Sequence, residues 1–223
     1  MEVQKVYKCL LAKFGPQGWW PIFDITTKKC KYRTIGFPKA DSHKFEICVG
    51  AILTQNTAWK NVEKALTNLC NSPLCKRGAR GDFQGLTPKL ILNSKNLEQL
   101  IQPAGYYNQK AKKLRIFSEW WQKSNPTKIK RPLNFCRIGL REELLSLWGI
   151  GPETADSMLL YAFNQPIFVI DTYTKRLCKE LGIEFREYDE YREFFESQLP
   201  QDPKLFNEYH ALIVAWGKAQ SSK

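Results

Sequence analysis

Apolar side chains recur at three- and four-residue intervals along most of this chain, the spacing that places them on one face of an α-helix. Both ends show it: the apolar positions are Val3, Val6, Tyr7, Leu10 and Leu11 in residues 2–14, and Leu205, Tyr209, Leu212, Ile213 and Trp216 in residues 205–219. In no stretch do apolar and polar residues alternate for long enough to predict a β-sheet. The pattern predicts an all-α protein of roughly ten helices without an internal repeat. The two terminal helices are expected to need each other as partners.

The middle of the chain predicts a long helical region with one interruption. Residues 45–70 keep the helical period on both sides of Gln55-Asn56-Thr57, where Asn56 or Thr57 is able to cap the second helix. Gln55 is therefore expected at a turn between two helices, with Trp59 in the first turn beyond it. Shorter helices are expected over 96–101, 108–123, 142–148, 172–181 and 188–198, and loops or linkers over 22–44, 71–90 and 124–137.

Two glycines separate a pair of predicted helices in residues 144–163. Gly149 and Gly151 allow a tight turn with bare amides, and Pro152 suits the first position of the helix that follows. Amides that converge at a helix N-terminus favour an anion, typically a phosphate. About twenty residues later, after the apolar run 167–170, Asp171 opens another helix, where an ordinary N-cap is the simpler interpretation.

The charge balance favours a polyanionic partner. Lys and Arg number 34 against 22 Asp and Glu, which gives a net charge of +12. A membrane surface is the competing interpretation, but no long apolar span or polybasic terminus supports it, and a basic surface for solubility alone stays open.

The seven cysteines are irregularly spaced and no signal peptide precedes them, so reduced thiols are expected. His43 and His210 are isolated, and no metal site is predicted.

Trp19-Trp20-Pro21 lies in a Gly/Pro-rich stretch and has two interpretations. The tryptophans either fill the space between two subdomains or offer a flat apolar wall on which a base stacks.

Three segments together, residues 147–156, 169–177 and 50–57, resemble the endonuclease III superfamily of helix-hairpin-helix DNA glycosylases. Residues 19–21, 53–57, 105–112 and 188–190 are most similar to its 3-methyladenine DNA glycosylase III branch. The resemblance covers nearly the whole chain. It implies a six-helix domain over 45–165 that contains the hairpin (144–163), and a second domain built from 1–44 and 166–223 that carries Asp171. The lesion pocket is expected between them.

The resemblance also implies a role for each residue that matches the family pattern. Asp171 is the expected catalytic carboxylate, and Gln55 is expected to fill the space that a flipped nucleotide leaves, with a loop-capping amide as the alternative. The expected base pocket is Trp19, Trp20, Pro21, Trp59, Tyr106, Tyr107 and Glu153, with the base between Trp20 and Trp59. Contacts to DNA are expected from Gln55, Asn56, Gly149, Ile150, Gly151, Thr154, Lys110, Lys112 and Lys113, with Arg77 as a further candidate.

Two departures from the family pattern sharpen the expected activity. Glu153 stands where bifunctional members have a lysine, and a carboxylate cannot form a Schiff base, so base removal without strand cleavage is predicted. The four cysteines of an iron–sulfur loop are missing after Trp216, so no iron–sulfur cluster is expected.

No other cofactor is expected, apart from a monovalent cation at the hairpin when DNA is bound. The expected partner is double-stranded DNA with a damaged base, and the protein is expected to be a monomer in the cytoplasm of a bacterium or archaeon, associated with the nucleoid.

Three alternatives stay open. The same fold accepts other lesions, such as an oxidised base, 8-oxoguanine or a mismatched base, and the sequence does not decide among them. A non-catalytic helix-hairpin-helix module is a second alternative, although a pure binder gains nothing from an acid beside phosphates. An RNA-binding or protein-interaction domain explains the charge but not the spacing from Gly149 to Asp171.

Overall fold

The computed structural model describes residues 3–24, 27–32, 38, 40–72, 85–127 and 133–221, with the backbone alone for 133–137 and 221. Within these ranges the chain is helical apart from two short strands. The elements are α1 (Val3–Phe14), β1 (Ile22–Asp24), β2 (Lys29–Lys31), α2 (Asp41–Thr54), α3 (Trp59–Asn71), α4 (Pro88–Asn93), α5 (Leu97–Leu100), the 3-10 helix η1 (Gln102–Ala104), α6 (Tyr107–Ser124), α7 (Leu133–Leu145), α8 (Pro152–Tyr161), α9 (Thr172–Glu180), α10 (Tyr188–Gln198) and α11 (Pro203–Ser221). The all-α prediction is confirmed.

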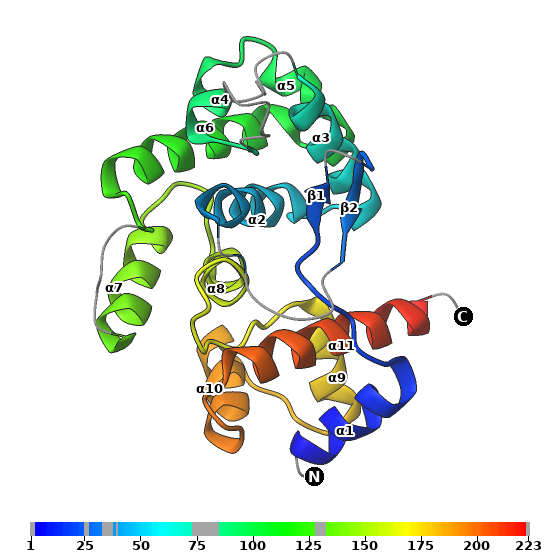
Figure 1. Cartoon of the computed structure of the whole chain (residues 1–223). Helices are drawn as coiled ribbons and strands as arrows, with labels where there is room; N and C mark the ends of the chain where they lie inside the picture. The colour runs from blue at the N-terminus through cyan, green and yellow to red at the C-terminus, as the bar shows by residue number, and fades with distance from the viewer. Residues whose placement is uncertain are drawn as a thin grey trace.

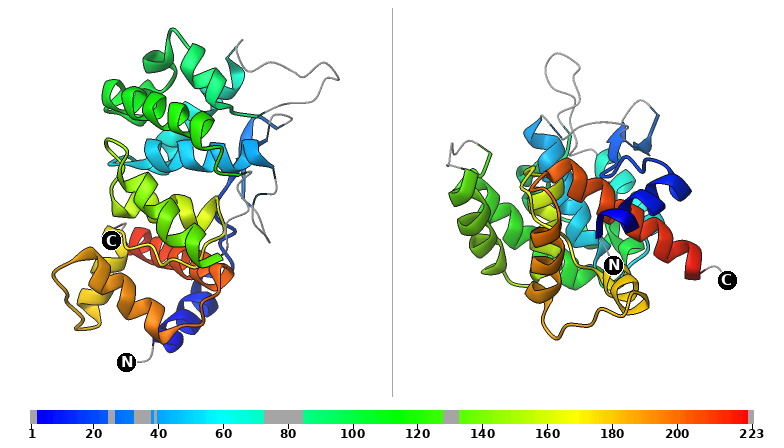
Figure 2. Two further views of the ribbon diagram at one scale, coloured as in Figure 1. Left: turned by 90° about the vertical axis from the view of Figure 1, so that its left-hand side faces the viewer. Right: turned by 90° about the horizontal axis from the view of Figure 1, so that it is seen from below.

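The helices lie in tiers (Figure 1). Helices α3 to α6 form the upper tier, α2 and α8 lie side by side in the middle, and α1, α9, α10 and α11 form the lower tier. Figure 2 shows the same order from the side. As expected, the helices of the two chain ends pack together, α1 against α11. The domain boundaries near residues 45 and 165 stay a prediction.

Helix α2 occupies the centre because its sequence is apolar on every side. All residues from Phe45 to Leu53 are buried, including Glu46, whose carboxylate accepts a hydrogen bond from the Phe23 amide at 2.6 Å. A helix that is hydrophobic all round must be enclosed by other elements. Helices α3, α6 and α8 and strand β1 enclose it, and its C-terminus delivers Gln55 to the middle of the molecule.

Three predicted boundaries were wrong. The range 71–90 was expected to be a loop, but α4 begins within it, where Thr87 accepts a hydrogen bond from the Leu90 amide at 3.2 Å and Pro88 takes the first helical position. Helix α7 begins at Leu133, inside the predicted linker. The predicted loop 22–44 contains the antiparallel pair β1–β2 and the first turn of α2. Residues 73–84 of the basic segment, including Arg77, lie outside the described residues.

A buried ion pair fixes α7 and α8 relative to α10. The Arg141 guanidinium on α7 donates to both carboxylate oxygens of Asp156 on α8, from Nε at 2.7 Å and from Nη2 at 3.2 Å. The same Nη2 reaches Asp189 on α10 at 3.0 Å. Asp156 has no exposed surface, and burial raises its pKa although Arg141 opposes the shift. The hairpin between α7 and α8 is thus anchored to a helix of the lower tier.

Candidate functional site

The Gly149-Ile150-Gly151 hairpin exposes backbone amides at the N-terminus of α8. Gly149 has φ +83°, a conformation that favours glycine, and a Cβ there would displace the Lys113 side chain. Gly151 faces open space, and no side chain caps α8. Neither glycine amide has an acceptor among the described residues. Ile150 is buried and anchors the turn. The hairpin therefore presents unpaired donors and the positive end of a helix dipole to an anion.

Gln55 joins the corner between α2 and α3 to the hairpin. Its Nε2 donates to the Gly149 carbonyl and to Thr154 Oγ1, both at 3.0 Å, and its Oε1 accepts from Lys113 Nζ at 2.5 Å. The side chain is half-buried, and Asn56 beside it is exposed with φ +50°. In this conformation Gln55 acts as a cap for neighbouring loops, the alternative interpretation. A cation on the Gly149 carbonyl would compete with the Gln55 hydrogen bond.

Lys110 does not lie where the sequence placed it. The prediction put it on the DNA-binding surface, but it is only 2% exposed, and its ammonium donates to the carbonyls of Leu53 and Ala104 at 2.8 and 2.7 Å. Burial, followed by the charge of Lys113, lowers its pKa to about 8. A lysine bound to the last carbonyls of a helix stabilises its C-terminus. Lys110 is thus an internal brace behind the Gln55 corner, and its ammonium does not reach phosphates on the surface.

Lys112 and Lys113 lie next to the hairpin, as expected for a basic face of α6. Lys112 Nζ lies 4.4 Å from the centre of the Trp148 ring, a cation–π distance, and Trp148 is half-exposed. The side-chain carbons of Lys113 pack against Gly149, and its ammonium donates to Gln55. Partial burial lowers the pKa of Lys113. Two cations therefore flank the exposed amides.

Asp171 caps the N-terminus of helix α9 through one carboxylate oxygen, Oδ1, and its other oxygen, Oδ2, takes no part in the cap. Its Oδ1 accepts from the Thr174 amide at 2.7 Å and from Thr174 Oγ1 at 2.9 Å, which confirms the N-cap. Oδ2 faces His210 on α11, whose Nε2 lies 3.5 Å away. Burial raises the pKa of Asp171, but His210 and the Thr174 donors outweigh it, and the net pKa is below the ordinary value. Asp171 is therefore an ionised carboxylate with a fixed orientation.

Glu153, in the first turn of α8, lies within electrostatic range of Asp171. Partial removal from water, followed by the negative charge of Asp171, raises the pKa of Glu153, and His210 and Lys175 oppose this shift. The residue as a whole is exposed. The structure thus brings Glu153 and Asp171 together from two helices, with Glu153 on the solvent side.

The tryptophans form a closed cluster instead of a slot. Trp20 and Trp59 meet edge to face with ring centres 5.3 Å apart, and both are 8% exposed. Trp20 also packs on α2, where Gly50 leaves room for the indole, and on Tyr161 at 5.1 Å. Perpendicular rings in contact leave no parallel walls for a base. The predicted base position between Trp20 and Trp59 is therefore wrong for this conformation, and the gap-filling interpretation describes these two rings. Pro21 is buried beside them.

Trp19 is the half-exposed member of the cluster. Its ring lies 5.8 Å from that of Tyr32, which is 48% exposed, and 5.5 Å from Lys218 Nζ on α11. Burial lowers the pKa of Lys218, and the charges of Asp171 and Glu63 oppose the shift, so the ammonium lies within range of both carboxylates. Trp19 and Tyr32 thus form a partly exposed aromatic surface, and the Lys218 ammonium beside Trp19 is also within range of the Asp171 charge.

Tyr106 and Tyr107 lie at the Gln55 corner, not in the tryptophan cluster. Tyr106 is 68% exposed with φ +45°, and Tyr107 is 36% exposed. Thr57 Oγ1 donates to the Ala104 carbonyl at 2.7 Å, which ties the turn before α6 to the corner after α2. The structure gives neither tyrosine a ring contact with the tryptophans. The prediction that they contribute to a pocket with Trp20 and Trp59 is not supported by this placement.

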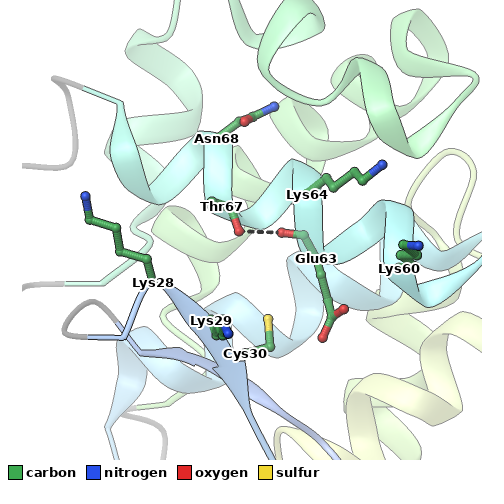
Figure 3. A pocket seen from close by; sticks show the side chains of 8 residues that line it. All are labelled: Lys28, Lys29, Cys30, Lys60, Glu63, Lys64, Thr67 and Asn68. Atoms are coloured by element: carbon green, nitrogen blue, oxygen red, sulfur yellow. Dashed lines mark hydrogen bonds between the residues drawn. The ribbon is translucent and has the colours of Figure 1, made fainter.

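A basic hollow of about 470 Å³ lies between strand β2 and helix α3 (Figure 3). Its lining residues are Lys28, Lys29, Cys30, Lys60, Glu63, Lys64, Thr67 and Asn68. The four lysine residues are exposed. Burial and then the negative charge of Glu63 raise the pKa of Tyr32. Because Glu63 lines the hollow, the hollow lies close to the aromatic surface of Trp19 and Tyr32. This basic hollow was not predicted.

Comparison with known proteins identifies the family. Residues 49–201 match the model of the HhH-GPD superfamily base excision DNA repair protein. The chain belongs to the HhH-GPD superfamily. A Methanocaldococcus jannaschii member named "Putative DNA repair glycosylase" is 40% identical over 95% of this chain and 85% of its own length. Endonuclease III of Thermotoga maritima is 28% identical over 82% of this chain and 78% of its own. These matches support a DNA glycosylase of the HhH-GPD superfamily.

Solved structures of HhH-GPD proteins have the same fold. The 3-methyladenine DNA glycosylase of H. pylori bound to 1,N6-ethenoadenine superposes with a TM-score of 0.73, at 30% identity over 99% of both chains. A trapped endonuclease III–DNA covalent intermediate gives a TM-score of 0.67 at 20% identity, over 98% of this chain and 87% of that one. The endonuclease III-like fold predicted from the sequence is confirmed.

Among the described residues of this HhH-GPD chain, no group of three or more His, Cys, Asp or Glu lies close enough together to hold a metal ion. Nor does any described helix have the length and apolar character to span a membrane.

The sequence interpretation missed His210, Tyr161, Lys218 and Tyr32 as neighbours of the HhH-GPD site. His210 is isolated in the sequence and lies 39 positions after Asp171. Tyr161 and Lys218 follow ordinary helical patterns. Tertiary packing alone brings Tyr161, His210 and Lys218 within range of Asp171, and Tyr32 to Trp19, so no local pattern could have identified them.

Proposed function

We propose that this protein is a monofunctional DNA glycosylase that hydrolyses the N-glycosidic bond of an alkylated purine in double-stranded DNA. The observation that carries the proposal is an ionised, oriented Asp171 within electrostatic range of Glu153, in the first turn of the helix whose uncapped N-terminus forms the glycine hairpin. The similarity to the 3-methyladenine DNA glycosylase of H. pylori, at 30% identity over the whole chain, favours an alkylated adenine as the substrate. We propose further that it acts as a monomer on DNA of the nucleoid.

DNA binding would begin at the hairpin. The amides of Gly149 and Gly151 would bind one phosphate, and Lys112 and Lys113 would add charge beside it. The corner residues Gln55 and Tyr106 lie on neighbouring turns joined through Thr57 and Ala104. When a nucleotide is extruded, these two side chains are suited to support the remaining stack, at the cost of the hydrogen bonds that Gln55 makes in this structure.

The extruded base would stack on one ring of the partly exposed pair Trp19 and Tyr32 and meet the edge of the other, because these two rings are nearly perpendicular. Stacking on an aromatic side chain contributes about 1–3 kcal/mol per base. N3-alkylated adenine is cationic, so an electron-rich indole favours it over a normal purine. Its glycosidic bond is already weak, and little proton donation to the base is needed. Asp171 would stabilise the positive charge that develops on the sugar or align the attacking water.

The absence of strand cleavage is proposed from Glu153. Glu153 stands where the family resemblance implies a lysine in bifunctional members, within electrostatic range of Asp171, and its carboxylate cannot form a Schiff base with the sugar. The experiment that tests the proposed function is a panel of duplexes, each with one lesion: N3-methyladenine, 1,N6-ethenoadenine, 8-oxoguanine, an oxidised pyrimidine, uracil and a mismatched base. Fastest release of free alkylated adenine supports the proposal. Fastest release of another base assigns that lesion instead, and no release from any duplex contradicts glycosylase activity.

Glu153→Lys is expected to produce weak strand cleavage and a covalent complex that borohydride traps. The new amine would lie beside Asp171, in the position from which a lysine attacks the sugar. Gel analysis with and without borohydride measures both products. Glu153→Gln is the control, because it removes the charge without adding an amine. If Glu153→Lys excises base but gives no trapped complex, position 153 does not reach the sugar.

Lys60→Ala combined with Lys64→Ala is expected to weaken DNA binding and flatten its salt dependence. The two lysines lie four residues apart on one face of α3, in the basic hollow next to the Trp19–Tyr32 surface. If each binds one phosphate, the slope of log affinity against log salt changes by about 2. Fluorescence anisotropy at several salt concentrations measures it. Lys8→Ala combined with Lys204→Ala removes the same charge from exposed positions on α1 and α11 and should leave the slope unchanged. If both double variants change the salt dependence of DNA binding equally, the net charge of the protein explains the effect and the basic hollow does not.

A further inference from the structure

His210 is a buried histidine between two buried or half-buried oxygen atoms. It lies on α11 and is 8% exposed. Its Nδ1 is 2.6 Å from the hydroxyl of Tyr161 on α8, and its Nε2 is 3.5 Å from Asp171 Oδ2. Nε2 makes no hydrogen bond among the described residues, and its contact with an acidic group is this 3.5 Å approach to Asp171. The three side chains therefore lie in a row, Tyr161–His210–Asp171, and each comes from a different helix or its N-cap.

The geometry determines what each group can supply. Asp171 Oδ1 already accepts two hydrogen bonds from Thr174, so Oδ2 is the oxygen left for chemistry. A neutral imidazole carries one N–H, and the other nitrogen must accept. If the Tyr161 hydroxyl donates to Nδ1, the proton of His210 is on Nε2 and points at Asp171 Oδ2. Tyr161 thus selects the tautomer that supports the carboxylate.

Packing alone would not require this arrangement. Tyr161 is 2% exposed and packs edge to face against Trp20, so it also links the histidine to the tryptophan cluster. A leucine at position 210 would fill similar space without a nitrogen for Tyr161 or a proton for Asp171. A buried polar group remains costly unless it is paired, and the group that Nε2 approaches, at 3.5 Å, is the carboxylate assigned to the chemistry.

We propose that His210 is a positioning residue for Asp171: Tyr161 holds its tautomer, and its Nε2–H keeps the Oδ2 oxygen ionised and directed at the sugar of the extruded nucleotide. The inference rests on the proposed glycosylase function. The other charged or titratable groups around the site are Glu153 on α8, Lys175 on α9, and Glu208 and Lys218 on α11. None of these takes the place of His210, because Thr174 holds Oδ1 and His210 Nε2 is the nitrogen that lies 3.5 Å from Oδ2.

The test compares His210→Leu with His210→Gln. The glutamine Nε2 amide can occupy nearly the place of the histidine Nε2 and still donate to Asp171, whereas leucine cannot. We expect the single-turnover excision rate of His210→Leu to fall roughly tenfold, the effect of losing one hydrogen bond to a charged group. His210→Gln should recover most of this rate. The affinity for lesion DNA should stay within about twofold of the native value in both variants, because neither group touches a phosphate.

A pH profile separates positioning from packing. Without His210 the pKa of Asp171 rises, so the acid limb of the excision rate should move to higher pH in His210→Leu and stay near the native position in His210→Gln. Tyr161→Phe should give a smaller shift in the same direction. Glu153→Gln, measured in parallel, identifies any limb that belongs to Glu153. An unmoved limb in a folded His210→Leu variant, or equal rate losses in both variants with equally lowered melting temperatures, overturns the proposal.

A measurement independent of activity distinguishes this inference from the proposed function. The Asp171 carboxylate can be titrated by carbon-13 NMR in the native protein and in His210→Leu. If the native protein releases no base from any duplex, the glycosylase proposal fails. The pKa of Asp171 must still rise in the variant if His210 supports it. An unchanged Asp171 pKa rejects the positioning role whatever the activity.

Discussion

Asp171→Asn is expected to lower the rate of base excision by about 10²–10³-fold or more, the effect of removing one charge-stabilising group from a transition state. Asparagine keeps the shape of the side chain but not the negative charge on Oδ2. It is also as good an N-cap as aspartate, so the hydrogen bond from the Thr174 amide should persist and the fold should survive. Single-turnover release of the base measures the rate, and binding to the lesion duplex should remain near the native affinity.

Asp171→Ala is the matched control for the structural role. Alanine removes both the charge and the cap, and a lost cap costs about 1 kcal/mol of stability. The two variants should therefore be equally inactive, while only Asp171→Ala is measurably less stable. Native excision by Asp171→Asn contradicts the assignment of Asp171 as the catalytic carboxylate.

Arg141→Met is expected to lower the free energy of unfolding by about 3–5 kcal/mol. Asp156 has no exposed surface, and without Arg141 its carboxylate would be buried without its cationic partner. The ion pair also joins α7 and α8 to Asp189 on α10, so the hairpin would lose its anchor to the lower tier. Urea unfolding at neutral pH measures the change.

The control for Arg141 is an arginine in an exposed pair. The Arg186 side chain is 93% exposed and meets Glu187 at 3.7 Å, so Arg186→Met should cost less than about 0.5 kcal/mol. Adding Asp156→Asn to Arg141→Met should recover part of the loss, because the buried charge is gone. A loss below about 1 kcal/mol in Arg141→Met would show that Asp156 finds water or another partner.

Local patterns predicted the elements that carry the hairpin and the acid. The break after Thr54, the glycine turn before Pro152 and the cap at Asp171 each depend on a few neighbouring residues, and the structure has all three. Helix α10 begins and ends where predicted, at Tyr188 and Gln198, and a capping box between Glu187 and Glu190 defines its start. The sequence was sufficient there because the signals are local.

Lys110 and the tryptophans show where local patterns fail. Lys110 belongs to a basic run on α6, and only the carbonyls of Leu53 and Ala104 explain why this one lysine is buried. The aromatic character of the site was predicted, but the perpendicular packing of Trp20 on Trp59 depends on Gly50 in another helix. Neither the exposed surface of Trp19 and Tyr32 nor the place of His210 follows from spacing along the chain.

The most direct test of the account is the reaction of the native protein with a duplex that carries one N3-alkylated adenine, analysed with and without alkali. The account predicts free base in solution, an intact strand before alkali, and a break at the lesion only after alkali, since Glu153 cannot attack the sugar. Strand breaks that accompany base release without alkali would contradict monofunctional chemistry. Absence of both products, with this duplex and with the rest of the panel, would contradict glycosylase activity itself.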